Sequence, residues 1–493
     1  MQQVKGQDAQ FIYMATGNNL THVTGISIFD PSTAANGKVT FDTFVEHVKS
    51  RQQTSPLYTR RLMHVPLEMD YPYWVDDEYF DIEYHIRQTT LPTPGNWNQF
   101  CDFLSRYHSS PLDMNRPPWE MMLVYGLDDI PGAAAGCFAC ITKIHHVAVD
   151  GASAISFFSA LSDIDAEGTP AIDLNSFSPV SSEAPTLPQM MKRALVNNVR
   201  SPIRLADTVM RAAPSIYNLI QSSLRNRSDT NKSVPHTRFN GEVSPHKTFD
   251  ATSFELAAFK NLRSLAEGAT INDIVLAVCS GALRRYLIHH NELPKEPLVA
   301  WVPINKRSSG SADGENPGNN ISAMTAAIHS NIEDPVERVK AITATTKESK
   351  EAKSGISARL MTDITKHIPA ATQLMAAKLV LNSAVAAGVC NLFISNVPGP
   401  QMQLYMAGAR QVDNMAMAPL GQGMGLFIAT PSYAGKISFS VTSTRDIMPD
   451  IGFFVTCLQA SLDELSALVS TEVDHLPKKT RKKKTNQKRD DSQ

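Results

Sequence analysis

Several sequence features that would define a particular chemistry are absent. No H-E-x-x-H motif and no cysteine–histidine cluster with zinc spacing occurs, so the sequence predicts no metal site. The absence of G-x-S-x-G excludes the nucleophile elbow of the covalent serine hydrolases. The six cysteines are scattered along the chain, and we expect reduced thiols, as is usual in the cytoplasm.

Long apolar segments are also scarce. The first residues, MQQVKGQDAQFIYM, lack the apolar stretch of a signal peptide, so we expect none. The longest uncharged span, 379–409, is interrupted by Pro398, Gly399 and Pro400, and therefore predicts no transmembrane helix. A composition of 42% hydrophobic and 19% charged residues is typical of a globular protein, and we expect a cytoplasmic location.

The length of 493 residues exceeds one ordinary core, so two domains of roughly 200 residues are expected. Strand-like and helix-like segments alternate in both halves, which predicts an α/β fold with mixed sheets. The expected divisions are an N-terminal domain over 1–165, a linker and helical crossover over 166–246, a C-terminal domain over 247–475, and a disordered basic tail over 476–493.

The basic tail differs in charge from the rest of the chain. Residues 476–493 contain eight Lys or Arg and two Asp, whereas the whole chain has a formal charge of -2. Such a tail can simply aid solubility, or it can bind anionic lipid at about 1 kcal/mol per basic residue near the surface. No platform of aromatic and basic residues accompanies it, so no nucleic-acid partner is expected.

The most informative stretch is CFACITKIHHVAVDGASAI, at 137–155. Its first part is apolar and β-rich, which predicts a buried strand, and its last part has helical spacing. Between them stands H-H-x-x-x-D-G, formed by His145, His146, Asp150 and Gly151. We expect Asp150 and Gly151 to shape the turn that orients the histidines at the strand end.

Strand geometry restricts what the histidine pair can do. Neighbouring residues on a strand face opposite sides, so His145 and His146 are not expected to share a metal ion. One histidine can act as a general base on a hydroxyl that attacks an acyl group, while the other is structural. Alternation does not say which. By the same geometry, Cys137 and Cys140 point to opposite faces and are expected to pack in the core.

With three further motifs, the chain resembles the bacterial wax ester synthase/acyl-CoA:diacylglycerol acyltransferase family. RPPWE at 116–120 corresponds to that family's P-L-W motif, with Pro118 where leucine is usual. TINDIVLA at 270–277 matches its N-D motif, and NVPGP at 396–400 matches a late signature. The resemblance extends to about residue 470 and leaves out the tail.

The resemblance implies two chloramphenicol-acetyltransferase-like domains with the active site in a channel between them. It implies that His146 is the general base that deprotonates a long-chain alcohol or the hydroxyl of diacylglycerol, with His145 as its structural neighbour. Fatty acyl-CoA would be the donor substrate, and no cofactor is expected. Positioning roles follow for Asn272, Asp273 and Trp119, although the first two also suit a helix start and Trp119 also suits the core.

Two other functions remain open at this point. One is a related CoA- or carrier-dependent acyltransferase with another alcohol or an amine as acceptor. The other is a non-catalytic lipid-surface protein whose tail does the binding, against which the intact H-H-x-x-x-D-G argues. Peripheral contact with the inner membrane or lipid bodies through the tail is a further expectation.

Overall fold

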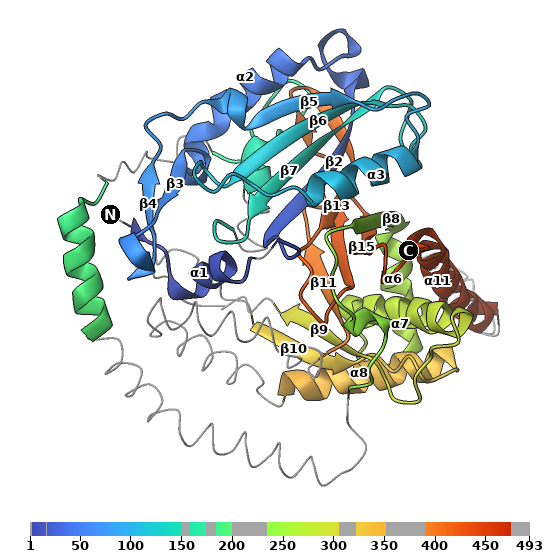
Figure 1. The fold of residues 1–493 in the computed structure, drawn as a ribbon. Helices are drawn as coiled ribbons and strands as arrows, with labels where there is room; N and C mark the ends of the chain where they lie inside the picture. Colours follow the sequence, from blue (N-terminus) through green and yellow to red (C-terminus); the bar gives the residue numbers. More distant parts are fainter. Residues whose placement is uncertain are drawn as a thin grey trace, which may run out of the picture.

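The computed structural model describes residues 2–15, 17–149, 157–173, 184–199, 234–304, 322–351 and 390–474. Within these ranges, the strands form two six-stranded sheets, which lie in different lobes, and one three-stranded sheet (Figure 1). The α/β prediction is therefore confirmed, with parallel and antiparallel pairs in both large sheets.

The first large sheet has β7 (Cys137–His145) at its centre, and all nine residues of β7 are buried. Phe138 and Cys140 pack with the helix α2 (Phe41–Arg51) on one face, whereas Ala139 and Ile141 pack with α3 (Trp97–His108) on the other. In spatial order its strands are β12 (Tyr405–Met406), β13 (Ala409–Met417), β2 (His22–Asp30), β7, β6 (Trp119–Leu127) and β5 (Ile86–Thr90).

The two neighbouring cysteines confirm the predicted alternation. Cys137 lies in the core on the α3 side of the sheet, and Cys140 lies in the core on the α2 side. Burial raises the pKa of the Cys140 thiol to about 12, so this thiol stays protonated at neutral pH. All six cysteines are described, buried and free of disulfide bonds.

The second large sheet carries its own core, which is covered by helices. The helix α7 (Ile271–His289) is buried along most of its length and starts with the capping box that Thr270 and Asp273 predict. The strands, in spatial order, are β10 (Ser322–Ala327), β9 (Val299–Ile304), β11 (Leu392–Pro398), β14 (Phe427–Tyr433), β15 (Lys436–Thr444) and β8 (Lys247–Glu255). The other helices of this lobe within the described ranges are α6 (Leu256–Leu262), α8 (Pro335–Glu351) and α11 (Ile451–Asp474).

The C-terminal half of the chain contributes a strand to the sheet of the first lobe. β13 comes from the C-terminal half of the chain, yet it pairs antiparallel with β2 in the first sheet, from Met417 opposite Thr24 to Arg410 opposite Asp30. Side chains also cross between the lobes, since the Trp97 indole donates to Asp250 over 2.8 Å. The domain ranges expected from the sequence are continuous and do not include this crossing, which makes residues 405–417 part of the first sheet.

The third sheet is small and lies near the N-terminus (Figure 1). α1 (Gly6–Tyr13) packs on one side of it, in a cluster that includes Val147 from the turn after β7. A helix over 187–199 packs on the other side through Met190 and Ala194. The strands are β1 (Gln2–Gln3), β4 (Tyr73–Asp76) and β3 (Arg60–Met63).

One described helix, α11, is long and apolar enough to cross a membrane by length and composition alone. The span Ile451–Val469 has a mean hydropathy of 1.2. Its Phe454, Leu458 and Leu465 side chains are buried in the second core, at the spacing of a helix that packs one face on its neighbours. The helix therefore has the packing of a core helix.

Candidate active site

His145 is held in one protonation state by its neighbours. Its Nδ1 accepts a hydrogen bond from the Val147 backbone N–H at 3.1 Å, so Nε2 is the nitrogen that carries the proton. Nε2 lies 3.0 Å from the Thr21 hydroxyl, which in turn donates to the Phe11 carbonyl at 2.6 Å. Burial, reinforced by the neighbouring His146, lowers the pKa of His145 to about 3. At neutral pH, His145 is thus a neutral, fully engaged side chain.

His146 lies in a different environment, in the turn that directly follows β7. Its side chain is half-buried, and its backbone N–H donates to the Thr21 carbonyl at 2.9 Å. Its ring stacks on the ring of Phe11, with 4.1 Å between centroids and 13° between planes. The ring plane of His146 is therefore set by an aromatic contact from α1.

Two residues from the N-terminal segment hold both histidines. The Thr21 carbonyl accepts the backbone N–H of His146, and the Thr21 hydroxyl is hydrogen-bonded to His145. The Phe11 ring stacks on the His146 ring, and the Phe11 carbonyl accepts the Thr21 hydroxyl. No sequence motif pointed to Phe11 or Thr21. The signal that could have found Thr21 is the register of β2, which places the adjacent His22 opposite His145.

Trp119 supports the histidine strand from the core. It is the first residue of β6, 2% exposed, and pairs with Ile144 of β7. Its indole donates to the Tyr58 carbonyl at 3.0 Å, and its ring stacks on His85 with 4.5 Å between centroids. The preceding carbonyl, that of Pro118, accepts the backbone N–H of His145 at 2.9 Å. These contacts give the RPPWE segment a structural role directly beside the motif.

The other predicted site residues are placed less closely or lie outside the description. Asp273 is buried, and its carboxylate accepts from the Thr270 backbone and hydroxyl and from the Thr346 hydroxyl, which accounts for both oxygens. Asn272 is half-buried in the first turn of α7. Asp150 and Gly151 lie outside the described residues.

A buried basic cluster lies on the same face of the sheet as His145, and the sequence did not predict it. Lys143 is fully buried, pairs with Glu120 at 2.6 Å and lies 4.1 Å above the Tyr107 ring. His108 Nδ1 and the Thr24 hydroxyl form a hydrogen bond of 2.8 Å. Burial lowers the pKa of His108 to about 3. In this cluster the cation Lys143 is thus paired, and burial keeps the imidazole of His108 neutral.

Comparison with known proteins identifies the family of the chain. The family model described as the wax ester synthase/diacylglycerol acyltransferase catalytic domain matches residues 4–275, and the model of the family's C-terminal domain matches 317–466. A Mycobacterium tuberculosis protein provisionally named a diacylglycerol O-acyltransferase is 31% identical over 94% of this chain and 90% of its own length.

Solved structures show the same relationship. The wax ester synthase/diacylglycerol acyltransferase from Marinobacter aquaeolei VT8 has a TM-score of 0.67 and 26% identity, over 95% of this chain and 100% of that one. The starter condensation domain of rhizomide synthetase, with a TM-score of 0.54 and 9% identity over 95% of this chain and 94% of that one, shares the fold alone. This protein thus belongs to the wax ester synthase/diacylglycerol acyltransferase family and is an acyltransferase with the two-domain fold that the sequence predicts.

Proposed function

We propose that the protein transfers a fatty acyl group from acyl-CoA to the hydroxyl of a long-chain alcohol or of diacylglycerol, with His146 as the general base. The observation that carries the assignment is the contrast between the two histidines. His145 is 5% exposed and has a strongly lowered pKa, whereas His146 is half-buried at the strand end, where its ring stacks on Phe11.

The proposed reaction needs one proton carrier. The His146 imidazole takes the proton of the acceptor hydroxyl as its oxygen attacks the thioester carbonyl carbon, and a tetrahedral intermediate forms. Its collapse breaks the carbon–sulfur bond, and the proton held by His146 goes to the leaving CoA thiolate. A positioned general base contributes about 10²- to 10⁴-fold to the rate. No cofactor is needed to balance this transfer, because the acyl group is already activated as a thioester.

The role of His145 follows from its low pKa. A histidine whose pKa is about 3 stays neutral at neutral pH and is a poor base for an alcohol. We assign His145 to positioning: its Nδ1 accepts the Val147 N–H and so fixes the turn on which His146 lies.

The test is the release of CoA thiol from palmitoyl-CoA with hexadecanol or diacylglycerol as acceptor. We expect His146→Ala to lose about 10²- to 10⁴-fold in kcat, while His145→Ala keeps measurable activity. His64→Ala serves as the matched control, because His64 is an exposed histidine with an ordinary surface partner, Glu68. Wild-type activity in His146→Ala, with the control also active, would end the general-base assignment. Activity with an amine acceptor alone would favour the related transferase.

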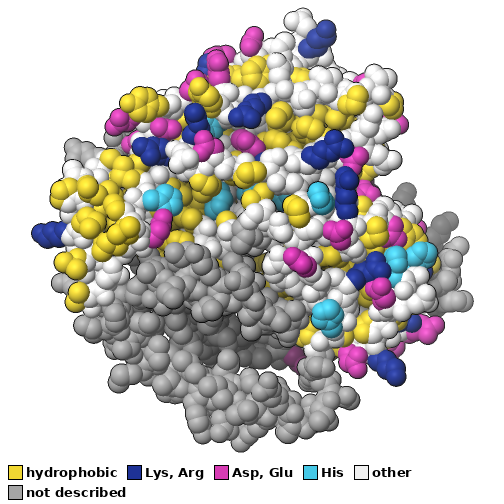
Figure 2. Space-filling view, viewed as in Figure 1, with side chains coloured by type: hydrophobic (Ala, Val, Ile, Leu, Met, Phe, Trp, Pro, Cys, Tyr) yellow, Lys and Arg dark blue, Asp and Glu magenta, His cyan; other side chains and the backbone are white. Residues whose placement is uncertain are grey.

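We further propose that the enzyme works in the cytoplasm at a lipid surface, because its acceptors are lipid-soluble. The helix 187–199 supports this proposal through an apolar stripe that faces solvent at every fourth position. Yellow side chains gather over this helix at the left edge of Figure 2. The stripe consists of Leu187, Met191, Leu195 and Val199, whose exposed fractions are 55%, 39%, 64% and 62%.

The charge of this helix suits an anionic surface. Lys192 is exposed beside the stripe, Arg193 interacts with Tyr73 of the small sheet, and the helix contains no acidic residue. An apolar stripe flanked by basic residues is the pattern of helices that lie in the plane of a membrane interface. The basic tail, 476–493, lies outside the described residues and remains a second candidate for the same contact.

Sedimentation with anionic liposomes tests the two surfaces separately. We expect Met191→Glu with Leu195→Glu to reduce binding at any salt concentration, whereas deletion of 478–493 reduces only the salt-sensitive part. Met402→Glu is the control, since Met402 is an exposed apolar residue elsewhere, at 51%. Undiminished binding by the helix variant would refute the stripe as a lipid contact. Turnover of soluble acceptors is expected to survive all three changes.

A further inference from the structure

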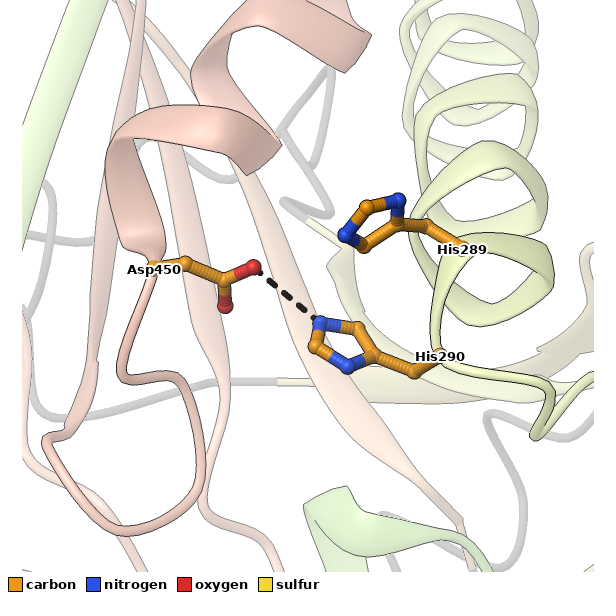
Figure 3. A group of neighbouring side chains, drawn as sticks. All are labelled: His289, His290 and Asp450. Carbon is orange, nitrogen blue, oxygen red and sulfur yellow. Dashed lines mark hydrogen bonds and ion pairs between the residues drawn. The ribbon is translucent and has the colours of Figure 1, made fainter.

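A second histidine pair meets a carboxylate at the junction of two helices. His289 is the last residue of α7, His290 follows it, and Asp450 directly precedes α11 (Figure 3). One potential ligand atom from each of the three residues lies within 4.8 Å of the others. None of the three was singled out in the sequence, because Asp450 lies far from the histidines along the chain.

The spacing of the donor atoms approaches that of a metal site. His290 Nε2 and Asp450 Oδ2 are 3.1 Å apart. Ligand atoms around a tetrahedral zinc ion, at bonds of about 2.0–2.1 Å, lie roughly 3.3 Å from each other. Two donors therefore already stand at ligand spacing. His289 is exposed, so a side-chain rotation can close the remaining gap.

Neighbouring residues orient the donors. The Tyr286 hydroxyl donates to Asp450 Oδ1 at 2.6 Å, which leaves Oδ2 to face the histidines. The ring of His289 lies 4.4 Å from that of Phe453, and this contact limits where the imidazole can turn. Such outer contacts tune ligand orientation in known metal sites.

The local charge permits a cation. His289 and His290 lie at the C-terminal end of a 19-residue helix, where the helix dipole favours positive charge. Arg238 donates to the Tyr286 hydroxyl at 3.2 Å, and its charge is paired with Glu292 through two contacts of 2.7 Å.

We propose that His289, His290 and Asp450 bind a divalent transition-metal ion such as Zn²⁺, with water completing the coordination. Two imidazoles and one carboxylate suit zinc, nickel or copper rather than magnesium or calcium. Binding uses the lone pair of His290 Nε2, so the proton shared with Asp450 moves to Nδ1 or to solvent. The ion would join the end of α7 to the start of α11, in the lobe that does not carry the H-H-x-x-x-D-G motif.

Zinc binding to the tag-free, chelator-treated full-length chain tests the proposal by calorimetry, with Co²⁺ absorption as a report of coordination. We expect one equivalent of tight binding in the wild type. His289→Ala and Asp450→Asn are each expected to weaken it about tenfold or more, and the asparagine keeps an oxygen for Tyr286. At the same zinc concentration, zinc should also raise the melting temperature of the wild type more than that of these variants.

His64→Ala is the matched control, because His64 and Glu68 form an exposed histidine–carboxylate pair without a third donor in the described residues. Its zinc affinity should equal that of the wild type. Equal zinc affinity in the wild type, His289→Ala and Asp450→Asn, or no binding by the wild type, would overturn the site. Acyl transfer measured in parallel shows whether a variant has remained folded.

Discussion

Substitution of Thr21 by valine tests the contacts that hold the histidine pair. Thr21 is 4% exposed, and valine has nearly the same shape, so the change removes little except the hydroxyl. The Nε2–H of His145 and the Phe11 carbonyl then lose their partner inside the fold. Leaving a buried polar group unsatisfied costs about 1–3 kcal/mol. The Thr21 carbonyl that binds His146 is part of the backbone and stays in place.

Thr21→Ser is the matched comparison, because it keeps the hydroxyl and removes a buried methyl group, which costs about 0.8 kcal/mol. Urea unfolding of both variants gives the free energies of unfolding. We expect Thr21→Val to be the less stable of the two. We also expect it to lose about tenfold in kcat, since a small displacement of a catalytic group is expensive, while Thr21→Ser stays near the wild type.

The opposite order would refute this account of the site. If Thr21→Ser unfolds more easily than Thr21→Val and both retain full activity, the methyl group matters and the hydroxyl does not. The hydrogen bond between the Thr21 hydroxyl and Nε2 of His145 would then contribute nothing measurable, and the positioning role given to this hydroxyl would fail.

Two further predictions concern pH and the core. Burial depresses the pKa of His145 and of His108 to about 3, below the unfolded value of about 6.5, so each favours folding fully above pH 6.5. As the pH falls from 6.5 toward 3, each histidine lowers the free energy of unfolding by about 1.4 kcal/mol per pH unit. His145→Gln should therefore make the urea midpoint of unfolding less dependent on pH between pH 7 and 5. An unchanged pH dependence would contradict this. Trp119→Phe removes the indole that donates to the Tyr58 carbonyl, and should lower the free energy of unfolding by about 1–3 kcal/mol in thermal unfolding. We expect its kcat to stay near that of the wild type. A loss of kcat without a loss of stability would assign Trp119 to the chemistry instead.

Local patterns in the sequence predicted the elements that carry the motif. The alternation of Cys137 and Cys140 and the apolar run before His145 depend on the period of a single strand, and both are confirmed. The capping box of Thr270 and Asp273 is likewise local, since its hydrogen bonds join residues three apart. Patterns of this kind are set by the chain's own geometry.

The contacts that could not be predicted join distant parts of the chain. Phe11 stacks on His146, and Asp450 meets His290, although neither partner belongs to a recognisable local pattern. Strand alternation alone treats His145 and His146 alike, so at the level of the sequence the choice of His146 came from the family resemblance. Thr21 is the residue that separates their environments, and nothing in its local sequence marks it.

The position of β13 in the first sheet has a consequence for the synthesis and the truncation of the chain. Until β13 has been added, β2 is an edge strand, and its backbone groups over 24–30 can pair with strands of other chains. A fragment that ends where the catalytic-domain match ends, at residue 275, would keep that open edge permanently. During synthesis this edge of β2 stays unpaired until residue 417 has left the ribosome. The N-terminal half therefore depends on the C-terminal half, or on a chaperone, for protection against aggregation.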